Sequence, residues 1–254
     1  MPKLKLTIQY DGTLYSGWQR QKRHETVQSI IEEALSEIFK REIKIRGAGR
    51  TDAGVHALGQ IATFTVNNSL PMNVLKKALN AILPSDIRIT DIEEVENNFH
   101  PQYSVKKKAY VYYICNDEFC PVFLQRFVWH FRGNLDFFLM QKAADIFKGT
   151  HDFTAFSGST EVKDRIRTIH SLTVELFNGL YFLDMKMDGN FIKFRIEADG
   201  FLKYMVRNIV GCLVEVGRGA LSENTIMEAL KTGRRPNPLR TAPPHGLFLE
   251  KVFY

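Results

Sequence analysis

The sequence lacks the cysteine pairs and long apolar runs that mark disulfide-rich or membrane-spanning proteins. It has 3 cysteines, and their odd number and the absence of CxxC pairs argue against a disulfide framework or a structural zinc site. No apolar run reaches the roughly 18 residues that span a bilayer. No hydrophobic signal segment follows Met1. We therefore expect a soluble, cytoplasmic protein that does not associate with a membrane.

The glycine patterns of nucleotide-binding loops are also missing. The densest glycine segment, residues 47–54, reads GxGxxxxG, which is not the dinucleotide-binding fingerprint. No GK[ST] follows it, which excludes a phosphate-binding loop of the NTPase type. Loops of these two kinds are therefore not expected in this protein.

The composition is that of a folded protein with a mild basic excess. Hydrophobic residues make up 44% and charged residues 24%, close to the average for globular proteins, so disorder is excluded. The net charge of +6 permits a polyanionic partner such as a nucleic acid without proving one.

Hydrophobic periodicity predicts alternating strands and helices in both halves of the chain. Residues 3–9 alternate polar and apolar side chains as a half-buried strand does, whereas residues 26–40 carry an apolar stripe behind a Thr26 N-cap. By the same criteria strands are predicted at 43–46, 60–66, 110–114, 172–176, 181–187, 192–196 and 246–253, and helices at 71–83, 134–147, 201–216 and 222–230.

This order of elements predicts an α+β protein with two similar halves. We expect α/β sandwich units of the RNP-like or ferredoxin-like kind, with a mixed, largely antiparallel sheet and a central cleft. The boundaries are residues 1–102, with the glycine-rich segment, and residues 103–254. No repeat is visible in the sequence, so the duplication is inferred from element order alone.

The glycine-rich segment holds the first candidate for chemistry. Asp52 lies two residues after Arg50, and a carboxylate that stays ionised beside a guanidinium is a potential nucleophile. The alternative is an ordinary turn, because Asp before Ala-Gly is common loop chemistry. The local pattern by itself favours the turn.

Two further segments admit a functional and a structural interpretation. Arg207 lies at the edge of an apolar helix stripe, where it suits either a partly buried carboxylate or a snorkelling surface position. The run from Ser104 to Ile114 joins lysines to tyrosines, including Tyr110 and Tyr112. Such a run suits phosphate contact and base stacking, or an edge strand guarded by lysines with a tyrosine packed in the core.

Taken together, these segments resemble the TruA-type tRNA pseudouridine synthases over the whole length of the chain. Residues 49–56, GRTDAGVH, are the most specific match. The other matching segments are Tyr10-Asp11-Gly12, Gly17-Trp18-Gln19, Thr26-Val27-Gln28, Phe99-His100-Pro101, Ser104 with Tyr110, Gly149-Thr150-His151-Asp152-Phe153, Phe201-Leu202, Met205-Val206-Arg207-Asn208-Ile209-Val210-Gly211 and Thr241-Ala242-Pro243.

The resemblance implies a role for each candidate. Asp52 matches the catalytic nucleophile, and Arg50 matches the arginine that helps to flip the target base. Tyr110 matches the tyrosine that stacks on the flipped uracil and assists proton removal from C5. Arg207 matches the arginine that pairs with the aspartate, and Leu247 resembles the apolar residue near the base.

The implied reaction is the isomerisation of uridine in tRNA. It breaks the N1–C1′ bond, rotates the uracil and joins it through C5, with no redox step or group transfer, so neither cofactor nor metal is required. Asp52 must attack C6 or C1′, and either attack requires a flipped base. The resemblance further implies uridines 38 to 40 of the anticodon stem-loop as substrates, and a homodimer whose cleft holds the tRNA.

The chain departs from the family pattern at a few positions, and two rival interpretations follow from the residues. Gln102, Ala109 and Pro244 differ from the usual residues, which leaves details of the tRNA contact open but not the activity. One rival is a non-catalytic RNA-binding protein, which predicts loss of the acid, although Asp52 is present. The other is an RNA methyltransferase that uses Cys120, and it would need a glycine-rich cofactor loop after the first strand.

Overall fold

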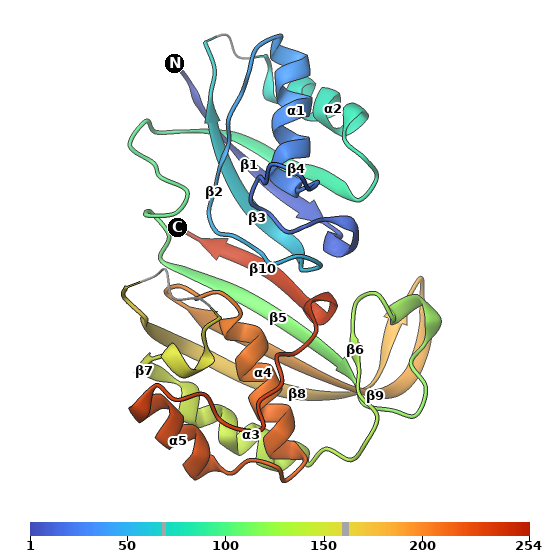
Figure 1. The fold of residues 1–254 in the computed structure, drawn as a ribbon. Helices are drawn as coiled ribbons and strands as arrows, with labels where there is room; N and C mark the ends of the chain where they lie inside the picture. Colours follow the sequence, from blue (N-terminus) through green and yellow to red (C-terminus); the bar gives the residue numbers. More distant parts are fainter. Residues whose placement is uncertain (68–69, 159–162) are drawn as a thin grey trace. The chain divides into compact units, whose positions relative to one another are not determined.

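The computed structural model describes residues 1–67, 70–158 and 163–254, which form two compact units (Figure 1). Unit 1 comprises Met1–Lys106 and Phe248–Tyr254, and unit 2 comprises Lys107–Leu247. The last residues of the chain therefore return to the unit in which the chain begins.

Unit 1 contains two helices and a sheet in which β1 lies between β4 and β3. β1 pairs antiparallel with both neighbours, β2 pairs antiparallel with β3, and β10 pairs parallel with β3. Its elements are β1 (Lys3–Tyr10), η1 (Gly12–Leu14), α1 (Val27–Phe39), β2 (Arg46–Gly47), β3 (His56–Thr65), α2 (Met72–Ile82), β4 (Ile87–Val95) and β10 (Leu247–Phe253).

The core of unit 1 follows the periodicities seen in the sequence. Along β1 the apolar side chains of Leu4, Leu6 and Ile8 are buried and the intervening residues are more exposed. The side chain of Thr26 accepts a hydrogen bond from the Ser29 amide, which caps α1 as predicted. Burial of one strand face and one helix stripe is what holds these elements together.

The predicted strand at 43–46 is wrong, because side chains of α1 occupy its backbone donors. The amide of Ile43 donates to Ser36 Oγ at 3.0 Å, and the amide of Ile45 donates to Glu32 Oε1 at 3.1 Å. Pairing with β3 begins only at Arg46.

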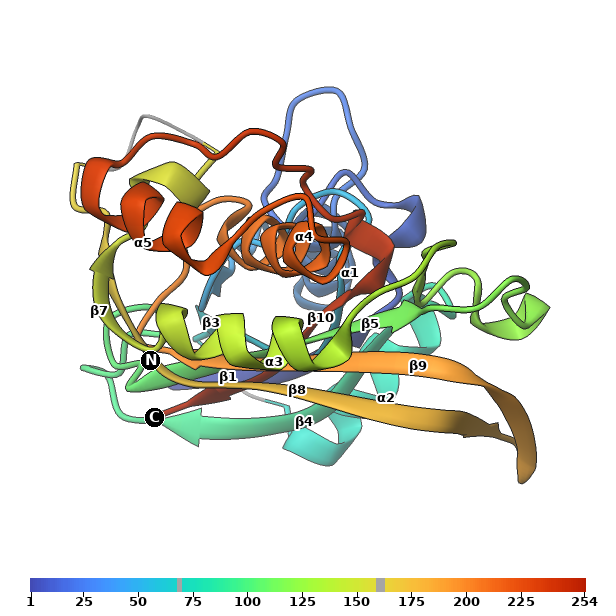
Figure 2. The same ribbon diagram turned by 90° about the horizontal axis from the view of Figure 1, so that it is seen from below.

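In unit 2 the strands of the sheet follow the order β5-β9-β8-β7, paired antiparallel, and β6 pairs parallel with β5. Helices α3, α4 and α5 lie on one face of this sheet (Figure 2). Its elements are β5 (Lys107–Cys115), η2 (Val122–Leu124), β6 (Trp129–His130), α3 (Phe137–Ala144), η3 (Asp145–Phe147), β7 (Gly149–Asp152), η4 (Thr154–Phe156), β8 (Ile166–Phe182), β9 (Met185–Ala198), α4 (Met205–Gly217), α5 (Glu223–Thr232) and η5 (Pro244–Gly246).

Two long strands replace the three short strands predicted between residues 172 and 196. A register shift between Phe177 and Gly179 absorbs the break in the apolar pattern, so β8 continues past it. The chain then turns through Leu183 and Asp184, which have positive φ angles of 49° and 63°. The α+β class with mixed, mostly antiparallel strands is confirmed. Over the described residues, the helices are too short or too polar to cross a membrane.

Candidate active site

The structure places the five candidate residues on four separate elements. Arg50 and Asp52 lie together in unit 1, on the loop that joins β2 to β3. In unit 2, Tyr110 lies on β5, Arg207 on the first turn of α4, and Leu247 at the residue where β10 begins. The pairing of Asp52 with Arg207 remains a prediction.

Backbone hydrogen bonds fix the candidate catalytic loop, residues 47–56, on both sides of Asp52. The amide of Ala48 donates to the Ile61 carbonyl at 2.7 Å, and the amide of Trp18 donates to the Thr51 carbonyl at 3.1 Å. Beyond Asp52, the amide of Gly54 donates to the Tyr15 carbonyl at 3.3 Å. The segment after β1 therefore holds the loop on both sides of the acid.

Buried side chains add a second set of contacts to this loop. The hydroxyls of Tyr10 and Thr51 lie 2.8 Å apart, and Gln60 Nε2 donates to the Gly49 carbonyl at 3.0 Å. Tyr10 and Gln60 are both buried, and burial raises the pKa of Tyr10 far above its ordinary value. Tyr10 therefore stays protonated and acts here as a support for Thr51, the residue before Asp52.

Two glycines permit the close approach of the segment after β1. A Cβ atom on Gly12 would lie 2.0 Å from the Val55 carbonyl oxygen. A Cβ atom on Gly17 would lie 2.6 Å from the Thr51 carbonyl oxygen, and Gly17 also has a φ of +91°. Gly12 therefore needs glycine for space alone, and Gly17 needs it for both space and backbone conformation.

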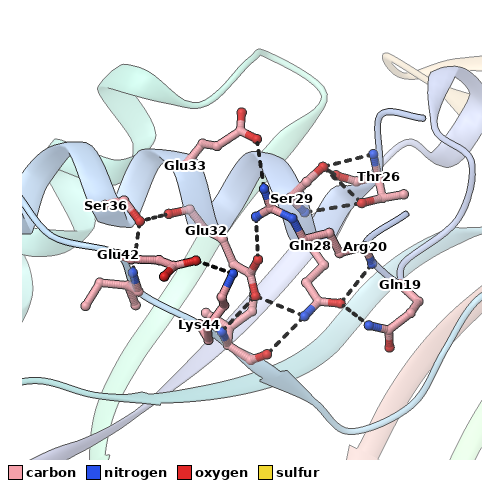
Figure 3. Close-up of polar contacts among 12 residues, drawn as sticks. Gln19, Arg20, Thr26, Gln28, Ser29, Glu32, Glu33, Ser36, Glu42 and Lys44 are labelled. Carbon is pink, nitrogen blue, oxygen red and sulfur yellow. Dashed lines mark hydrogen bonds and ion pairs between the residues drawn. The ribbon is translucent and has the colours of Figure 1, made fainter. Parts of the chain in front are cut away.

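A chain of amide groups leads from the candidate catalytic loop into α1. Arg50 Nε donates to Gln19 Oε1 at 3.1 Å, and Gln19 Nε2 donates to Gln28 Oε1 at 2.8 Å. Gln28 Nε2 in turn donates to Glu32 Oε1 at 3.0 Å, and Figure 3 shows Gln28 between Gln19 and Glu32. The exposed Arg50 guanidinium is thus connected to a carboxylate that is only 1% exposed.

In unit 2, Arg207 is held at the start of α4 by backbone and aromatic contacts. Its Nε donates to the Ala242 carbonyl at 2.7 Å, and the Ala242 amide donates back to the Arg207 carbonyl at 3.1 Å. The guanidinium carbon lies 5.0 Å from the ring centroid of Tyr204, close enough for a cation–π contact. These contacts fix the side chain of Arg207. The alternative of a surface arginine that extends into solvent did not predict them.

The two tyrosines of β5 have different surroundings. Tyr110 is 7% exposed, and its ring meets Phe201 edge-on at 4.9 Å. Tyr112 is fully buried, and its hydroxyl donates to the Pro243 carbonyl at 2.8 Å. Burial raises the pKa of Tyr112 well above its ordinary value, so Tyr112 is the structural member of the pair.

The residues around Leu247 are tightly packed. Leu247 is 4% exposed and follows Gly246, where a Cβ atom would lie 2.7 Å from the ring of Tyr112.

Residues 1–67, 70–158 and 163–254 contain no group of three His, Cys, Asp or Glu side chains arranged to bind a metal ion.

Sequence reasoning missed the supporting residues Tyr10, Gln19, Gln60 and Tyr204. Tyr10 and Gln19 belong to segments that match the family, but their partners lie 41 and 31 residues away in the sequence. Spacing therefore gave no indication of these contacts. For Gln60 and Tyr204 no signal was present in the local pattern.

Comparison with known proteins identifies the family. The family model described as tRNA pseudouridine synthase matches residues 6–104 and 143–254. tRNA pseudouridine synthase A of Thermodesulfovibrio yellowstonii is 60% identical, and that of Acetivibrio thermocellus is 42% identical, each over the full length of both chains. A chain of the Cbf5–Nop10–Gar1 complex shares 12% identity at a TM-score of 0.35, covering 83% of this chain and 45% of that chain. That last similarity is too low to support an argument. On the matched residues and the full-length identity, the chain belongs to the tRNA pseudouridine synthase A family of isomerases.

Proposed function

We propose that this enzyme converts uridine to pseudouridine at positions 38, 39 and 40 of the tRNA anticodon stem-loop, with Asp52 as the nucleophile. The observation that carries the proposal is the fixation of the catalytic loop on both sides of Asp52, with Arg50 beside it. A carboxylate held in place by a preformed loop suits attack on a carbon that must be presented to it. The family match supports the reaction class.

The reaction balances without an external reactant. The carboxylate of Asp52 bonds to C6 of the uracil or to C1′ of the ribose, and the N1–C1′ bond breaks. After rotation of the uracil a C5–C1′ bond forms, C5 loses its proton, N1 gains one, and the carboxylate is released. No electrons are transferred to another molecule, so the proposal includes no cofactor.

Base flipping gives Arg50 its role. In a paired stem C6 and C1′ are poorly accessible, so the nucleotide must leave the stack before attack. Arg50 is exposed and lies two residues from Asp52, where it suits the space that the flipped base vacates. The hydrogen bond to Gln19 holds its guanidinium before the substrate arrives.

The unit 2 candidates complete the proposed site. Arg207 pairs with the carboxylate of Asp52, Tyr110 stacks on the flipped uracil and assists proton removal from C5, and Leu247 packs near the base. Support comes from the contacts that fix Arg207 and from the edge-on packing of Tyr110 against Phe201. A low-dielectric pocket strengthens the charge pair, and the paired guanidinium of Arg207 keeps the nucleophile ionised.

The halves expected from the sequence, residues 1–102 and 103–254, remain part of this proposal, with the tRNA in a cleft. In unit 1, α1 lies between β1 and β2 in the sequence and α2 between β3 and β4, and the sheet order is β4-β1-β3-β2. That arrangement is the split βαβ pattern of RNP-like units, which supports the ferredoxin-like assignment. We place the reaction in the cytoplasm.

Exposed apolar side chains in unit 2 support the expected homodimer. Phe119 and Val122 are 74% and 78% exposed, and Tyr181 and Leu183 at the turn of the β8–β9 hairpin are 75% and 79% exposed. Such residues favour a protein interface when they gather on one surface. Light scattering during gel filtration tests the oligomeric state, and a monomer at micromolar concentration would contradict the proposed homodimer.

Tritium release tests the activity. An unmodified tRNA transcript with uridines at 38, 39 and 40, labelled with tritium at C5, releases tritium when C5 becomes the glycosidic carbon. We expect release by the wild type and none by Asp52→Asn, with the exposed Asp91→Asn of the same unit as a control. Transcripts with a single uridine at one of the three positions then identify the sites. A folded wild type that binds tRNA without release would favour the RNA-binding alternative.

A further inference from the structure

The turn between Gln19 and Thr26, here called the basic turn, exposes a cluster of cations in unit 1. Residues 20–25 are all exposed, and residues 20–24 read RQKRH, so Arg20, Lys22 and Arg23 lie within five positions. The first acidic residue after this run is Glu25. The basic turn therefore carries a concentrated positive charge on a short protrusion.

The basic turn has a fixed conformation. Gln21 and His24 form an antiparallel bridge across it, and the amide of Ser16 donates to the Glu25 carbonyl at 2.9 Å. The side chain of Gln21 also donates to the Ser16 carbonyl, at 2.9 Å. These contacts close the turn at its base and fix the backbone from which its cations project.

A buried carboxylate anchors the first cation of the turn. Arg20 Nη1 lies 2.8 Å from Glu32 Oε2, and Glu32 also accepts hydrogen bonds from Gln28 and from the Ile45 amide (Figure 3). Arg20 is thereby neutralised and serves as an anchor. Among the residues that the structure describes, Lys22 and Arg23 have no ion-pair partner, so their charges are directed to solvent.

The same hydrogen-bonded frame holds Arg50. Gln28 Oε1 accepts from the Arg20 amide at 3.0 Å and from Gln19 Nε2 at 2.8 Å, and Gln19 Oε1 accepts from Arg50. The basic turn and the proposed base-flipping arginine are therefore connected through the hydrogen-bonded side-chain amides of Gln19 and Gln28. Their relative position is set before any RNA binds.

We propose that Lys22 and Arg23 of the basic turn bind backbone phosphates of the tRNA, adjacent to the nucleotide that Arg50 engages. This inference rests on the proposed function and adds to it a contact surface outside the reaction centre. Phosphate contacts position a nucleic acid without reading its sequence, which suits an enzyme that acts at three neighbouring uridines. A turn whose backbone is already fixed also loses little backbone conformational entropy on binding.

The salt dependence of tRNA binding tests the inference. Each phosphate contact contributes about 0.7–0.9 to the slope of log affinity against log salt concentration. We expect the double variant Lys22→Ala/Arg23→Ala to lower the magnitude of this slope by about 1.5. We also expect it to raise KM about tenfold at 0.1 M salt, equally for transcripts with a single target at 38, 39 or 40.

The matched control removes the same two residue types elsewhere in unit 1. Arg41→Ala/Lys77→Ala loses one arginine and one lysine from exposed positions, so its net charge equals that of the test variant. An equal slope for the two double variants would overturn the inference, because only a general charge effect would remain. Thermal unfolding of both variants within about 2 °C of the wild type excludes a folding defect.

Failure of this inference is distinguishable from failure of the proposed function. Tritium release by the wild type tests the reaction without reference to Lys22 or Arg23. Filter binding of end-labelled tRNA across about 50–200 mM salt tests the phosphate contacts even if no tritium is released from C5. If the salt slope of the double variant equals that of the wild type while the wild type releases tritium, only the inference about the basic turn is refuted.

Discussion

The side chain of Gln19 accepts a hydrogen bond from Arg50 across 3.1 Å, and this bond joins the segment after β1 to the loop that carries Asp52. Arg50 is exposed, so without Gln19 its long side chain would sample many rotamers in water. Gln19 thus acts as a positioning residue for Arg50, although it lies 31 positions away in the chain.

Replacing Gln19 with Ala is expected to lower kcat/KM about fivefold to tenfold, because a hydrogen bond of about 1 kcal/mol that orients Arg50 is lost. In an Arg50→Ala background the same change should have almost no effect, since the group that Gln19 orients is gone. Tritium-release kinetics of the wild type, Gln19→Ala, Arg50→Ala and the double variant give the coupling energy between the two residues. The exposed Gln141→Ala is the control, and an effect of Gln19→Ala that persists without Arg50 would contradict the role.

Tyr10→Phe removes the hydroxyl that lies 2.8 Å from Thr51 Oγ1 and leaves the buried threonine hydroxyl without this partner. We expect a loss of about 1–2 kcal/mol in the free energy of unfolding, measured in urea. We also expect a lower kcat, because Thr51 precedes Asp52. The exposed Tyr181→Phe should change neither quantity, and a kcat for Tyr10→Phe equal to that of the wild type would argue against the support role.

Glu32→Ala leaves the Ile45 amide, the Gln28 amide nitrogen and Arg20 without their shared acceptor. The expected cost is about 2–4 kcal/mol of unfolding free energy, since the change breaks a buried network and only part of Arg20 reaches water. Glu33→Ala is the matched control, because Glu33 is 69% exposed and lies 3.8 Å from Arg20. Its expected effect is below about 0.5 kcal/mol, and equal losses for the two variants would contradict this account.

Burial, and to a lesser degree the charge of Arg167, lowers the pKa of Lys108 from 10.5 to about 8. At pH 7 the lysine is protonated in the folded and unfolded chain, so the fold carries the full cost of the buried ammonium. Between pH 8 and 10.5 the unfolded chain binds the extra proton, so wild-type stability rises with pH through this window.

Lys108→Met should therefore stabilise the protein by about 1–3 kcal/mol at pH 7, and the gain should vanish near pH 10.5. Urea unfolding of both proteins at pH 7, 8.5 and 10 measures the difference. Lys107→Met is the neighbouring control, where loss of the ion pair with Glu197 predicts no such stabilisation. A constant difference between wild type and Lys108→Met at all three pH values would be evidence against the lowered pKa.

The elements that the sequence predicted well are those whose cause is local. The helix at Val27–Phe39 follows from an apolar stripe and the Thr26 cap, and both signals lie within the segment itself. The strand expected at 43–46 failed because its amides bond to Ser36 and Glu32, which the pattern of residues 43–46 cannot reveal. Local periodicity records side-chain burial and contains no information on which distant group takes a backbone donor.

The candidate site likewise has parts that the local sequence predicts and parts that depend on distant residues. The glycines around Asp52 marked the loop, and the resemblance to a family assigned its roles, whereas the local chemistry of the loop favoured a simple turn. The supports of the loop come from Tyr10, Gln19 and Gln60, and Gln60 lies on the strand that follows. Their importance depends on packing of distant segments, so only the three-dimensional arrangement identifies them.

The pairing of β10 with β3 joins two parts of unit 1 that lie far apart along the chain. Phe248 and Leu249 of β10 pair with His56 and Ala57, at the end of the loop that carries Asp52. Contacts between residues of high sequence separation form slowly, because the entropy of closing a long loop must be lost first. We therefore expect the sheet next to Asp52 to form late in folding. Comparing tritium release by this chain with that of a variant without residues 248–254 measures how far the reaction depends on this pairing.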